Sequence, residues 1–399
     1  MPALRNAIKA LLANPAILTA GPALDLFLCQ YMRKFRLREV GGQVIIHSHL
    51  PPLGSKAFGR FVNEHLVRRN DGPSHAQVAV TSTCPQRCSF CYNRDRTGTP
   101  LSRAEILRTI DQLADAGVFW LGLTGGEPLL SPDLVEIVEH AATRCSVKLF
   151  TTGCGLTPQR ARDLKNAGLF SVSVSLDHWD EETHDRGRNY RGAFRAALAA
   201  ITTFKEAGLD TGVSTVLSKE MITRGETARL LEFLEGLGVH EIWLSETKPS
   251  VQPFWDESLL ITDEERSQLI ALQDRYNRSG RGTLNYLGHF ESAGHFGCTA
   301  GRKMVYVDAF GEISPCVFAP MTFGNLRQKP LAAILTEMRS AFRMGSTCFI
   351  SRHYKILRDR SGGALPVPAD QSAEMMRQVQ FTPMSRFFEL HARRHGQPA

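Results

Sequence analysis

Residues 77–91 read Gln77-Val-Ala-Val-Thr-Ser-Thr-Cys84-Pro-Gln-Arg-Cys88-Ser-Phe-Cys91, and this stretch decides how the chain is interpreted. Its first part, residues 78–83, is apolar and rich in β-branched side chains, which predicts a strand. Its second part places three cysteines at a Cys-x3-Cys-x2-Cys spacing directly after that strand. Because parallel α/β sheets carry their chemistry at the carboxyl ends of the strands, we expect Cys84, Cys88 and Cys91 to ligate a metal centre at a functional site.

Short apolar runs alternate with amphipathic stretches from this point to residue 246. Six strands that alternate with five helices favour parallel strands joined by right-handed crossovers, so the expected fold class is α/β. The predicted strands are 78–83, 119–124, 147–152, 170–176, 211–217 and 241–245, and the predicted helices are 103–116, 132–142, 158–167, 194–207 and 226–237.

The composition is that of a well-packed globular protein, with 399 residues, 43% hydrophobic residues and a net charge of +7. It excludes a disordered, collagen-like or disulfide-dense chain. The positive charge lies at the ends: residues 1–75 hold ten Lys/Arg against four Asp/Glu, and residues 351–399 hold eight against four. The region between them is slightly acidic and has no basic stripe with interleaved aromatics, so we expect no nucleic-acid partner.

Nine cysteines without a secretory signal indicate metal chemistry in a reducing, cytoplasmic compartment rather than disulfides. Zinc is the alternative for the cluster at 84–91, but zinc sites normally use four ligands in two separated pairs. We expect the scattered Cys29, Cys145 and Cys154 to be buried apolar side chains.

A second motif, Gly125-Gly126-Glu127-Pro128, follows the second predicted strand. The glycines allow the backbone to approach a ligand closely, and Glu127 can offer a carboxylate to a positively charged amino group.

Together, the three cysteines, the aromatic Phe90, the Gly125–Pro128 motif and the six repeats over about residues 77–246 resemble the radical S-adenosylmethionine (radical SAM) enzymes. The resemblance implies a partial (βα)6 barrel. It also implies a [4Fe-4S] cluster on the three cysteines, whose open iron binds the amine and carboxylate of S-adenosylmethionine. An electron from an external reductant such as flavodoxin or ferredoxin then yields a 5′-deoxyadenosyl radical that abstracts hydrogen from the substrate.

The resemblance assigns roles to further residues. Glu127 and the backbone of Gly125, Gly126 and Pro128 would meet the methionyl amine, and Phe90 would lie near the adenine. Thr152, Ser175 and Arg188 would complete the cofactor pocket; the less favoured alternative is that Ser175 forms a turn at the strand end and Arg188 an exposed cap. The candidate catalytic residues at the same end of the sheet are Cys154, His178 and Glu246.

Cys298, Gly311 and Cys316 follow a Cys-x12-Gly-x4-Cys spacing around a predicted hairpin, and only Cys348 comes later. This pattern resembles the SPASM/Twitch extension, but the later Cys-x2-Cys-x5-Cys run is missing. We therefore expect one auxiliary iron–sulfur cluster on Cys298, Cys316 and Cys348, with its fourth site left to another ligand or to substrate. Packed or zinc-binding cysteines are the alternative.

The expected domains are a basic N-terminal extension (1–75), the barrel (76–250), a linker with a helix (251–297), the auxiliary cluster region (298–350) and a basic tail (351–399). Residues 10–24 are uncharged but too short and too interrupted by proline to span a bilayer. They predict either a helix packed on the core or an element that makes peripheral contact with anionic lipid at a membrane surface.

The leading functional hypothesis is hydrogen abstraction from a small-molecule or lipid-like biosynthetic substrate. The alternative within the same chemistry is a peptide maturase acting on a ribosomal precursor. It ranks second because residues 1–75 show too little strand pattern for a winged-helix leader-binding domain. An alternative from another class is a non-catalytic iron–sulfur or zinc-binding protein.

Overall fold

A nine-stranded sheet dominates the part of the chain that the computed structural model describes, which is residues 8–9, 12–32, 34–35, 37–68, 70–279, 282–363 and 365–394. Neighbouring strands are parallel throughout, except for β11, which runs antiparallel to β10 at one edge. In spatial order the strands are β11 (Ile313–Ser314), β10 (Met304–Val307), β3 (His75–Ala79), β4 (Trp120–Thr124), β5 (Ser146–Thr151), β6 (Ser171–Ser175), β7 (Asp210–Leu217), β8 (Glu241–Glu246) and β9 (Thr283–Tyr286).

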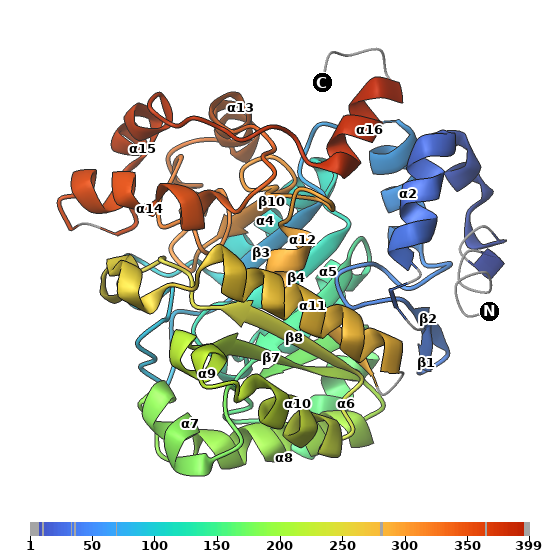
Figure 1. Ribbon diagram of the computed structural model, residues 1–399, viewed down its shortest axis with the longest axis vertical. Helices are drawn as coiled ribbons and strands as arrows, with labels where there is room; N and C mark the ends of the chain where they lie inside the picture. Colours follow the sequence, from blue (N-terminus) through green and yellow to red (C-terminus); the bar gives the residue numbers. More distant parts are fainter. Residues whose placement is uncertain are drawn as a thin grey trace.

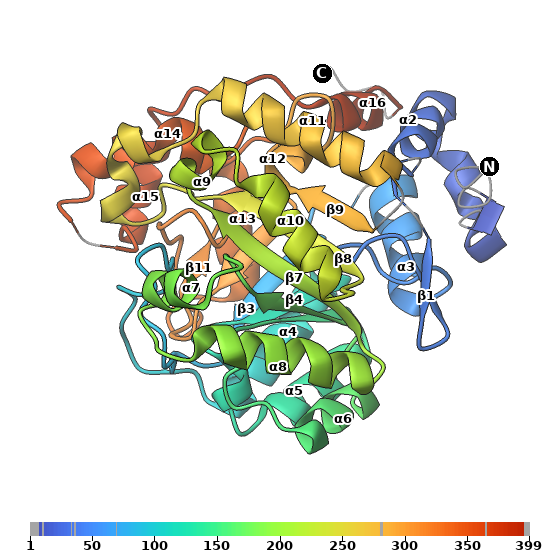
Figure 2. The same ribbon diagram turned by 60° about the horizontal axis from the view of Figure 1, so that its bottom comes forward.

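The strands β3 to β8 and the helices between them form the α/β partial barrel that the alternating pattern predicted (Figures 1 and 2). Strand β4 is buried at all five positions because helices cover its outer face. The first of these helices begins where Ser102 and Glu105 form a reciprocal capping box. The helices of this region are α4 (Arg103–Asp115), α5 (Leu134–Ala142), α6 (Pro158–Asn166), α7 (Glu181–Arg188), α8 (Ala193–Glu206), α9 (Lys219–Thr223) and α10 (Thr227–Gly236), with the short turn η3 (Pro128–Leu130).

Both edges of the barrel sheet are extended by strands from the C-terminal half. Strand β9 lies in the region expected to be a linker and pairs with β8, whereas β10 pairs with β3. The predicted hairpin is confirmed, and Gly311 adopts the positive φ of +89° that its turn requires. The connecting elements are η4 (Gln252–Trp255), η5 (Glu257–Leu259), α11 (Asp263–Ser279) and α12 (Leu287–Phe290).

Residues 351–399, expected to form a basic tail, hold most of α14 (Phe349–Arg360), α15 (Ala369–Met376) and α16 (Arg386–Arg394). The first two lie near α13 (Leu331–Ala341), whereas α16 packs against α2 (Pro22–Met32) near the beginning of the chain (Figure 1).

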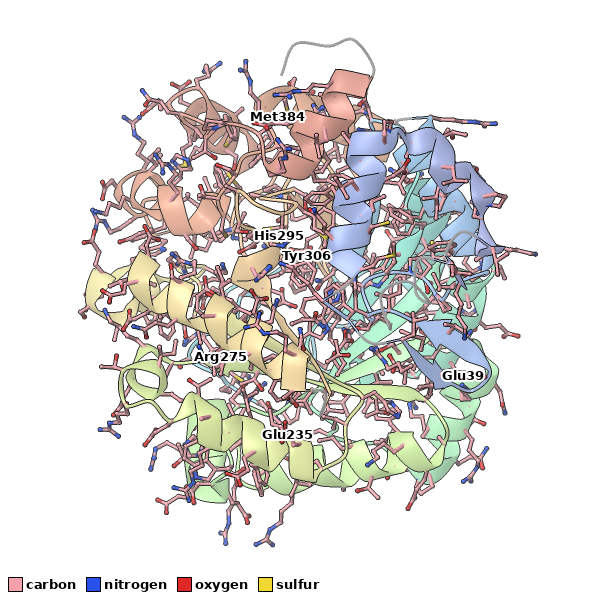
Figure 3. The ribbon with its side chains drawn as sticks, turned by 45° about the vertical axis from the view of Figure 1, so that its right-hand side comes forward. Glu39, Glu235, Arg275, His295, Tyr306 and Met384 are labelled. Carbon is pink, nitrogen blue, oxygen red and sulfur yellow. The ribbon has the colours of Figure 1, made fainter. Side chains whose placement is uncertain are left out.

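The N-terminal helices and α16 build what we call the N-terminal lobe, with an apolar core separate from that of the barrel. Figure 3 shows α2 and α16 on the same side of the molecule, with His295 and Met384 nearby. The lobe consists of η1 (Pro15–Ala20), α2 (Pro22–Met32), α3 (Lys56–Arg60), the π-helical η2 (Phe61–Val67) and α16.

A two-stranded hairpin of β1 (Arg38–Val40) and β2 (Gln43–Ile45) ties this lobe to the barrel. Arg38 donates to Asp210 at 2.9 Å and to Glu241 at 3.3 Å, and both carboxylates are buried. Residues 1–7, 10 and 11 of the predicted extension, and Arg33 and Arg36 of its basic run, lie outside the described residues. None of the described helices combines the length and the apolarity that crossing a membrane requires.

Candidate active site

The three cysteines of the first motif lie on the loop that follows β3. The strand ends at Ala79, earlier than predicted, so residues 80–91 are free to curve around the cavity. Burial and, to a smaller extent, the charges of Glu127, Cys91 and Cys88 raise the pKa of Cys84 to about 12. The three sulfurs would repel one another as thiolates, and a bound cationic centre would reduce that repulsion.

Gly125 and Gly126 pack the second motif directly against the cysteine loop. The amide of Gly126 donates to Thr81 and that of Glu127 to Thr83, each at 2.7 Å. A Cβ on Gly126 would lie 2.1 Å from the carbonyl oxygen of Thr83, so no larger residue fits. The glycines are thus required by contact with the chain's own backbone, whereas the sequence suggested that a ligand required them.

Glu127 is completely buried, and the end of β5 and the turn η3 hold its carboxylate. Its Oε1 accepts from Thr151 Oγ1 at 2.5 Å and from the Leu129 amide at 3.0 Å, while Oε2 accepts from the amide and hydroxyl of Thr152 at 2.6 and 2.5 Å. Burial raises the pKa of Glu127, and these hydrogen bonds oppose the shift. A bound amine would have to share these occupied acceptor positions.

Arg188, at the end of α7, lies between the cysteine loop and a carboxylate that the sequence did not single out. It donates to Asp177 Oδ2 at 2.7 Å, approaches Cys88 Sγ at 4.0 Å and covers the ring of Phe90 at 5.4 Å. Burial opposes its charge, yet Asp177 and Cys88 raise the pKa of Arg188 above its ordinary value. Arg188 is buried rather than an exposed cap, and Asp177 already neutralises it.

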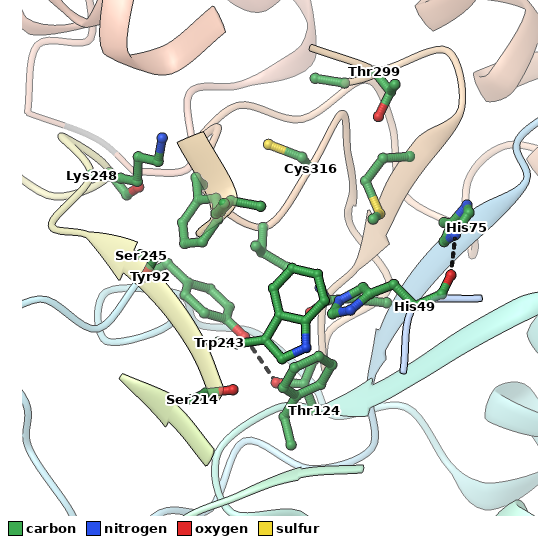
Figure 4. A pocket seen from close by; sticks show the side chains of 18 of the residues that line it. His49, His75, Tyr92, Thr124, Ser214, Trp243, Ser245, Lys248, Thr299 and Cys316 are labelled. Carbon is green, nitrogen blue, oxygen red and sulfur yellow. Dashed lines mark hydrogen bonds between the residues drawn. The ribbon is translucent and has the colours of Figure 1, made fainter. Parts of the chain in front are cut away.

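Two residues directly after Cys91 connect the motifs to one another. Asn93 donates to the carbonyl of Gly125 at 2.8 Å and accepts from the hydroxyl of Tyr306 at 2.6 Å, and Tyr92 bonds the Thr124 hydroxyl at 2.8 Å. Figure 4 shows Tyr92 and Thr124 joined in this way beside His49 and Trp243. Their position next to Cys91 was the signal that could have identified them.

One cavity of about 1070 Å³ contains both sets of clustered cysteines on its wall. Its lining also includes Phe90, Gly125, Gly126, Glu127, Thr152, Ser175, Arg188 and Glu246 from the predicted site. Pro128 is buried in η3 behind the motif.

Of the candidate catalytic residues, only Glu246 borders this cavity among the described residues that line it. Cys154 lies behind the lining and contacts Gln86 at 3.8 Å, and His178 stacks on Trp179 with a ring separation of 4.0 Å. The geometry therefore does not bring Cys154 or His178 to a bound substrate. Burial opposes ionisation of Glu246, but Lys248 and Arg266 lower its pKa to about 2, so it is a paired carboxylate rather than a proton donor.

Cys298, Cys316 and Cys348 meet at the opposite part of the cavity wall. Burial and then the neighbouring Cys348 raise the pKa of Cys316 to about 12. Beside them, Lys248 bridges Glu246 at 2.9 Å and Glu291 at 2.7 Å, and both Lys248 and Glu291 line the cavity. Neither Lys248 nor Glu291 carries a sequence motif, so only the structure identifies this charged pair.

The residues of both sets fit iron–sulfur clusters. All six thiols are free, and protein N–H groups face the sulfurs, as is typical of cluster sites. The amide of Phe349 donates to Cys298 at 3.4 Å, and the amides of Gln86 and Asn93 bond Cys84 and Cys91.

Comparison with known proteins agrees with both sites. Residues 78–234 match the radical SAM superfamily, and residues 298–356 match the SPASM iron–sulfur cluster-binding domain. The second match supports auxiliary iron–sulfur binding by the region that contains Cys298, Cys316 and Cys348.

Two relatives and one solved structure show how far the similarity extends. The chain is 29% identical to an AdoMet-dependent heme synthase of Methanosarcina barkeri, over 73% of this chain and 92% of that protein. It is 33% identical to a PqqA peptide cyclase of Bradyrhizobium diazoefficiens, over 37% of this chain and 40% of that protein.

The crystal structure of Streptococcus suis SuiB bound to precursor peptide SuiA covers 80% of this chain and 79% of that chain, with a TM-score of 0.56. At 16% identity, that likeness is one of fold. The motifs, the barrel and the two domain matches lead to one conclusion: the chain is a radical SAM enzyme that uses a [4Fe-4S] cluster and S-adenosylmethionine and carries a SPASM iron–sulfur domain.

Proposed function

We propose that this radical SAM enzyme matures a peptide, by removing hydrogen from a peptide segment that enters the cavity between the two cysteine sets. The observation that supports this most directly is that Cys84, Cys88 and Cys91 share one cavity with Cys298, Cys316 and Cys348. A peptide cyclase among the relatives and a similar structure bound to a precursor peptide support the same substrate class. This ranks the peptide above the small molecule that the sequence favoured.

The cavity is larger than a site for one small ligand, and it would have to hold S-adenosylmethionine and the clusters as well as the substrate. Sites for drug-sized ligands occupy about 300–1,000 Å³, and this cavity of about 1070 Å³ exceeds that range. S-adenosylmethionine beside Cys88 would leave space towards Lys248 and Glu291. That buried charged pair can bind the amide or charged groups of a peptide segment and hold it in one register.

Cys84, Cys88 and Cys91 would hold the cluster beside S-adenosylmethionine, and the two together would supply the radical chemistry for hydrogen abstraction. The chain's own residues position the reactants: Asp177 orients Arg188 beside Cys88, and Thr151 and Thr152 hold the Glu127 carboxylate. We expect an external reductant such as flavodoxin or ferredoxin to deliver the electron.

The first experiment tests the chemistry. Anaerobically reconstituted protein with reductant should convert S-adenosylmethionine to 5′-deoxyadenosine and methionine, and Cys88→Ala should abolish the product. Cys29→Ala, outside the cavity lining, is the matched control and should retain it. Product formation by Cys88→Ala would remove the assignment of this cysteine.

The second experiment tests the substrate class. Peptides encoded beside the gene should gain a mass change by mass spectrometry, and deuterium from a labelled peptide should appear in 5′-deoxyadenosine. Label transfer from a non-peptide substrate, with none from any peptide, would overturn the peptide proposal and leave the radical chemistry intact.

A second candidate is a small molecule with a large apolar body. The specific observation is the apolar part of the cavity under the N-terminal lobe, lined by Leu28, Tyr31, Met32, Phe296, Phe387 and Phe388. The heme synthase among the relatives is compatible with an apolar substrate of this size. The same deuterium-transfer assay, with labelled tetrapyrroles or acyl lipids in place of peptide, discriminates between the two candidates.

A further inference from the structure

The N-terminal lobe exposes an unusual amount of apolar surface. Four of the seven exposed large apolar side chains found among the described residues belong to residues 8–26. They are Ile8 (46% exposed), Leu12 (79%), Leu18 (63%) and Leu26 (60%). Scattered apolar side chains need no explanation, but a concentration in one short segment marks an interaction surface.

Helix α2 is apolar on its inner and outer faces. Leu24, Phe27 and Tyr31 are buried in the lobe, whereas Leu26 points to solvent. A helix on a water-exposed surface normally presents a polar outer face, and one that is apolar all round is normally covered. Figures 1 and 2 both place α2 at an outer corner of the molecule, away from the sheet, where a partner can reach it.

The charge of the lobe is mainly positive. The exposed charged side chains within the described part of its helices are basic, namely Lys56 in α3 and Arg386 and Arg393 in α16, and exposed Arg68 follows η2. The acidic side chains of the same helices, Asp25, Glu64 and Glu389, are half-buried, and exposed Glu39 and Asp71 lie in adjoining segments. Exposed apolar side chains on elements with an excess of exposed Lys and Arg are typical of elements that lie in the surface of an anionic bilayer. A second copy of the chain would bring the same basic groups against these, which disfavours self-association.

We propose that the N-terminal lobe docks on an anionic lipid bilayer, with Leu12, Leu18 and Leu26 inserted at the boundary between headgroups and acyl chains. The docking goes beyond the proposed function and does not depend on which substrate the enzyme modifies. It has a structural consequence, because Leu28 and Met32 of the same helix line the substrate cavity. The apolar end of that cavity therefore lies directly behind the surface that meets the lipid.

The experiment measures binding of the full-length reconstituted protein to vesicles of phosphatidylcholine alone and of phosphatidylcholine with phosphatidylglycerol. The test variant is Leu12→Glu/Leu18→Glu/Leu26→Glu, and the matched control is Leu259→Glu, an exposed leucine (43%) in η5. Burial of one leucine corresponds to about a tenfold change in an equilibrium constant or more. Cleavage of S-adenosylmethionine, assayed in solution, verifies that both variants fold.

We expect the wild type and Leu259→Glu to bind the anionic vesicles, with weaker binding at about 0.5 M salt than at about 0.1 M salt. The triple variant should lose at least about tenfold in binding while it retains S-adenosylmethionine cleavage. Absence of wild-type binding to anionic vesicles, or equal binding by the triple variant, would overturn the proposal. Leucine-dependent dimerisation in light scattering without vesicle binding would also overturn it, because a second copy would then cover the surface.

Discussion

The buried ion pair between Arg96 and Asp308 provides a direct test of how the two cysteine regions are held together. Arg96 follows the first cysteine motif, Asp308 follows β10, and their side chains are 4% and 2% exposed. The Nη1–Oδ2 distance is 3.0 Å, and Arg96 also donates to Ser314. The pair therefore joins the loop of one iron–sulfur site to the hairpin of the other.

Removal of one partner leaves the other charge buried. Arg96→Met isolates the Asp308 carboxylate, whose Oδ1 still accepts from the amides of Phe310 and Glu312 at 2.9 Å. Breaking a buried pair in this way costs about 3–5 kcal/mol. At about 2 °C per kcal/mol for a large domain, the melting temperature should fall by roughly 6–10 °C.

A double variant distinguishes the ion pair from general packing. In Arg96→Met/Asp308→Asn the residual charge is neutralised, and the asparagine oxygen can still accept both backbone bonds, so the double variant should melt above Arg96→Met. Arg224→Met is the matched control, because its pair with Glu220 is 63% and 66% exposed and contributes less than about 1 kcal/mol.

The assay is thermal unfolding of the reconstituted protein under anaerobic conditions. A melting temperature for Arg96→Met within about 2 °C of the wild type would show that the ion pair does not stabilise the fold as expected. A further decrease in the double variant would lead to the same conclusion, because the loss would then not arise from an unpaired charge.

The packing of Gly126, the iron content and the acid stability of the chain can each be tested separately. Gly126→Ala should abolish S-adenosylmethionine cleavage, because the added Cβ would collide with the cysteine loop. Gly236→Ala is the control and should retain full activity, because the space around its Cβ is open. An active Gly126→Ala variant would contradict the expected collision. If each cysteine set holds a [4Fe-4S] cluster, iron analysis should find about eight iron atoms per chain, and about four after Cys298 and Cys316 are replaced by alanine. About four iron atoms in the wild type would argue against an auxiliary cluster. The hydrogen bond from Arg327, with that of Ser102, lowers the pKa of Glu105 to about 2. The pKa of Glu105 is lower in the folded chain than in the unfolded chain, so its hydrogen bonds stabilise the fold above about pH 4.5, and this stabilisation is lost as the pH falls towards 2. The contribution is less than about 1 kcal/mol because the pair is accessible to solvent. The melting temperature of the cluster-free chain should therefore decrease less between pH 5 and pH 3 in Glu105→Gln than in the wild type. Equal decreases would contradict a stabilising role of the Glu105 carboxylate.

Local patterns were sufficient to predict the barrel, because strand and helix periodicity depends on near neighbours. The predicted helix at 103–116 corresponds to α4, which Ser102 caps. Strand β9 was missed because residues 283–286 form a short run whose partner, β8, is 37 or more residues earlier. The first strand was predicted at 78–83 but spans His75–Ala79, so both of its ends were placed too late; β-branched residues continue past Ala79 into the cysteine loop.

The candidate active site likewise combines residues that the sequence predicts with residues that only tertiary contacts reveal. Cys84, Cys88 and Cys91 lie within eight residues, so their spacing alone indicated a shared centre. Lys248 and Glu291 were not predicted because they belong to no motif and acquire their role by pairing with each other across 43 positions of the sequence. Cys154 and His178 were suggested by their position after strands, but the cavity wall runs in front of them.

The fold class, the radical SAM motifs and the second cysteine set could be predicted from the amino-acid sequence, because each depends on residues close together along the chain. The shared cavity of the two cysteine sets, the pairing of Arg96 with Asp308 and the packing of α16 on α2 in the N-terminal lobe became apparent only from the folded chain. These contacts join residues far apart in sequence, Arg96 and Asp308 being separated by 212 positions. Such contacts form because folding buries apolar faces and pairs buried charges, and no local pattern records which distant partner will meet them.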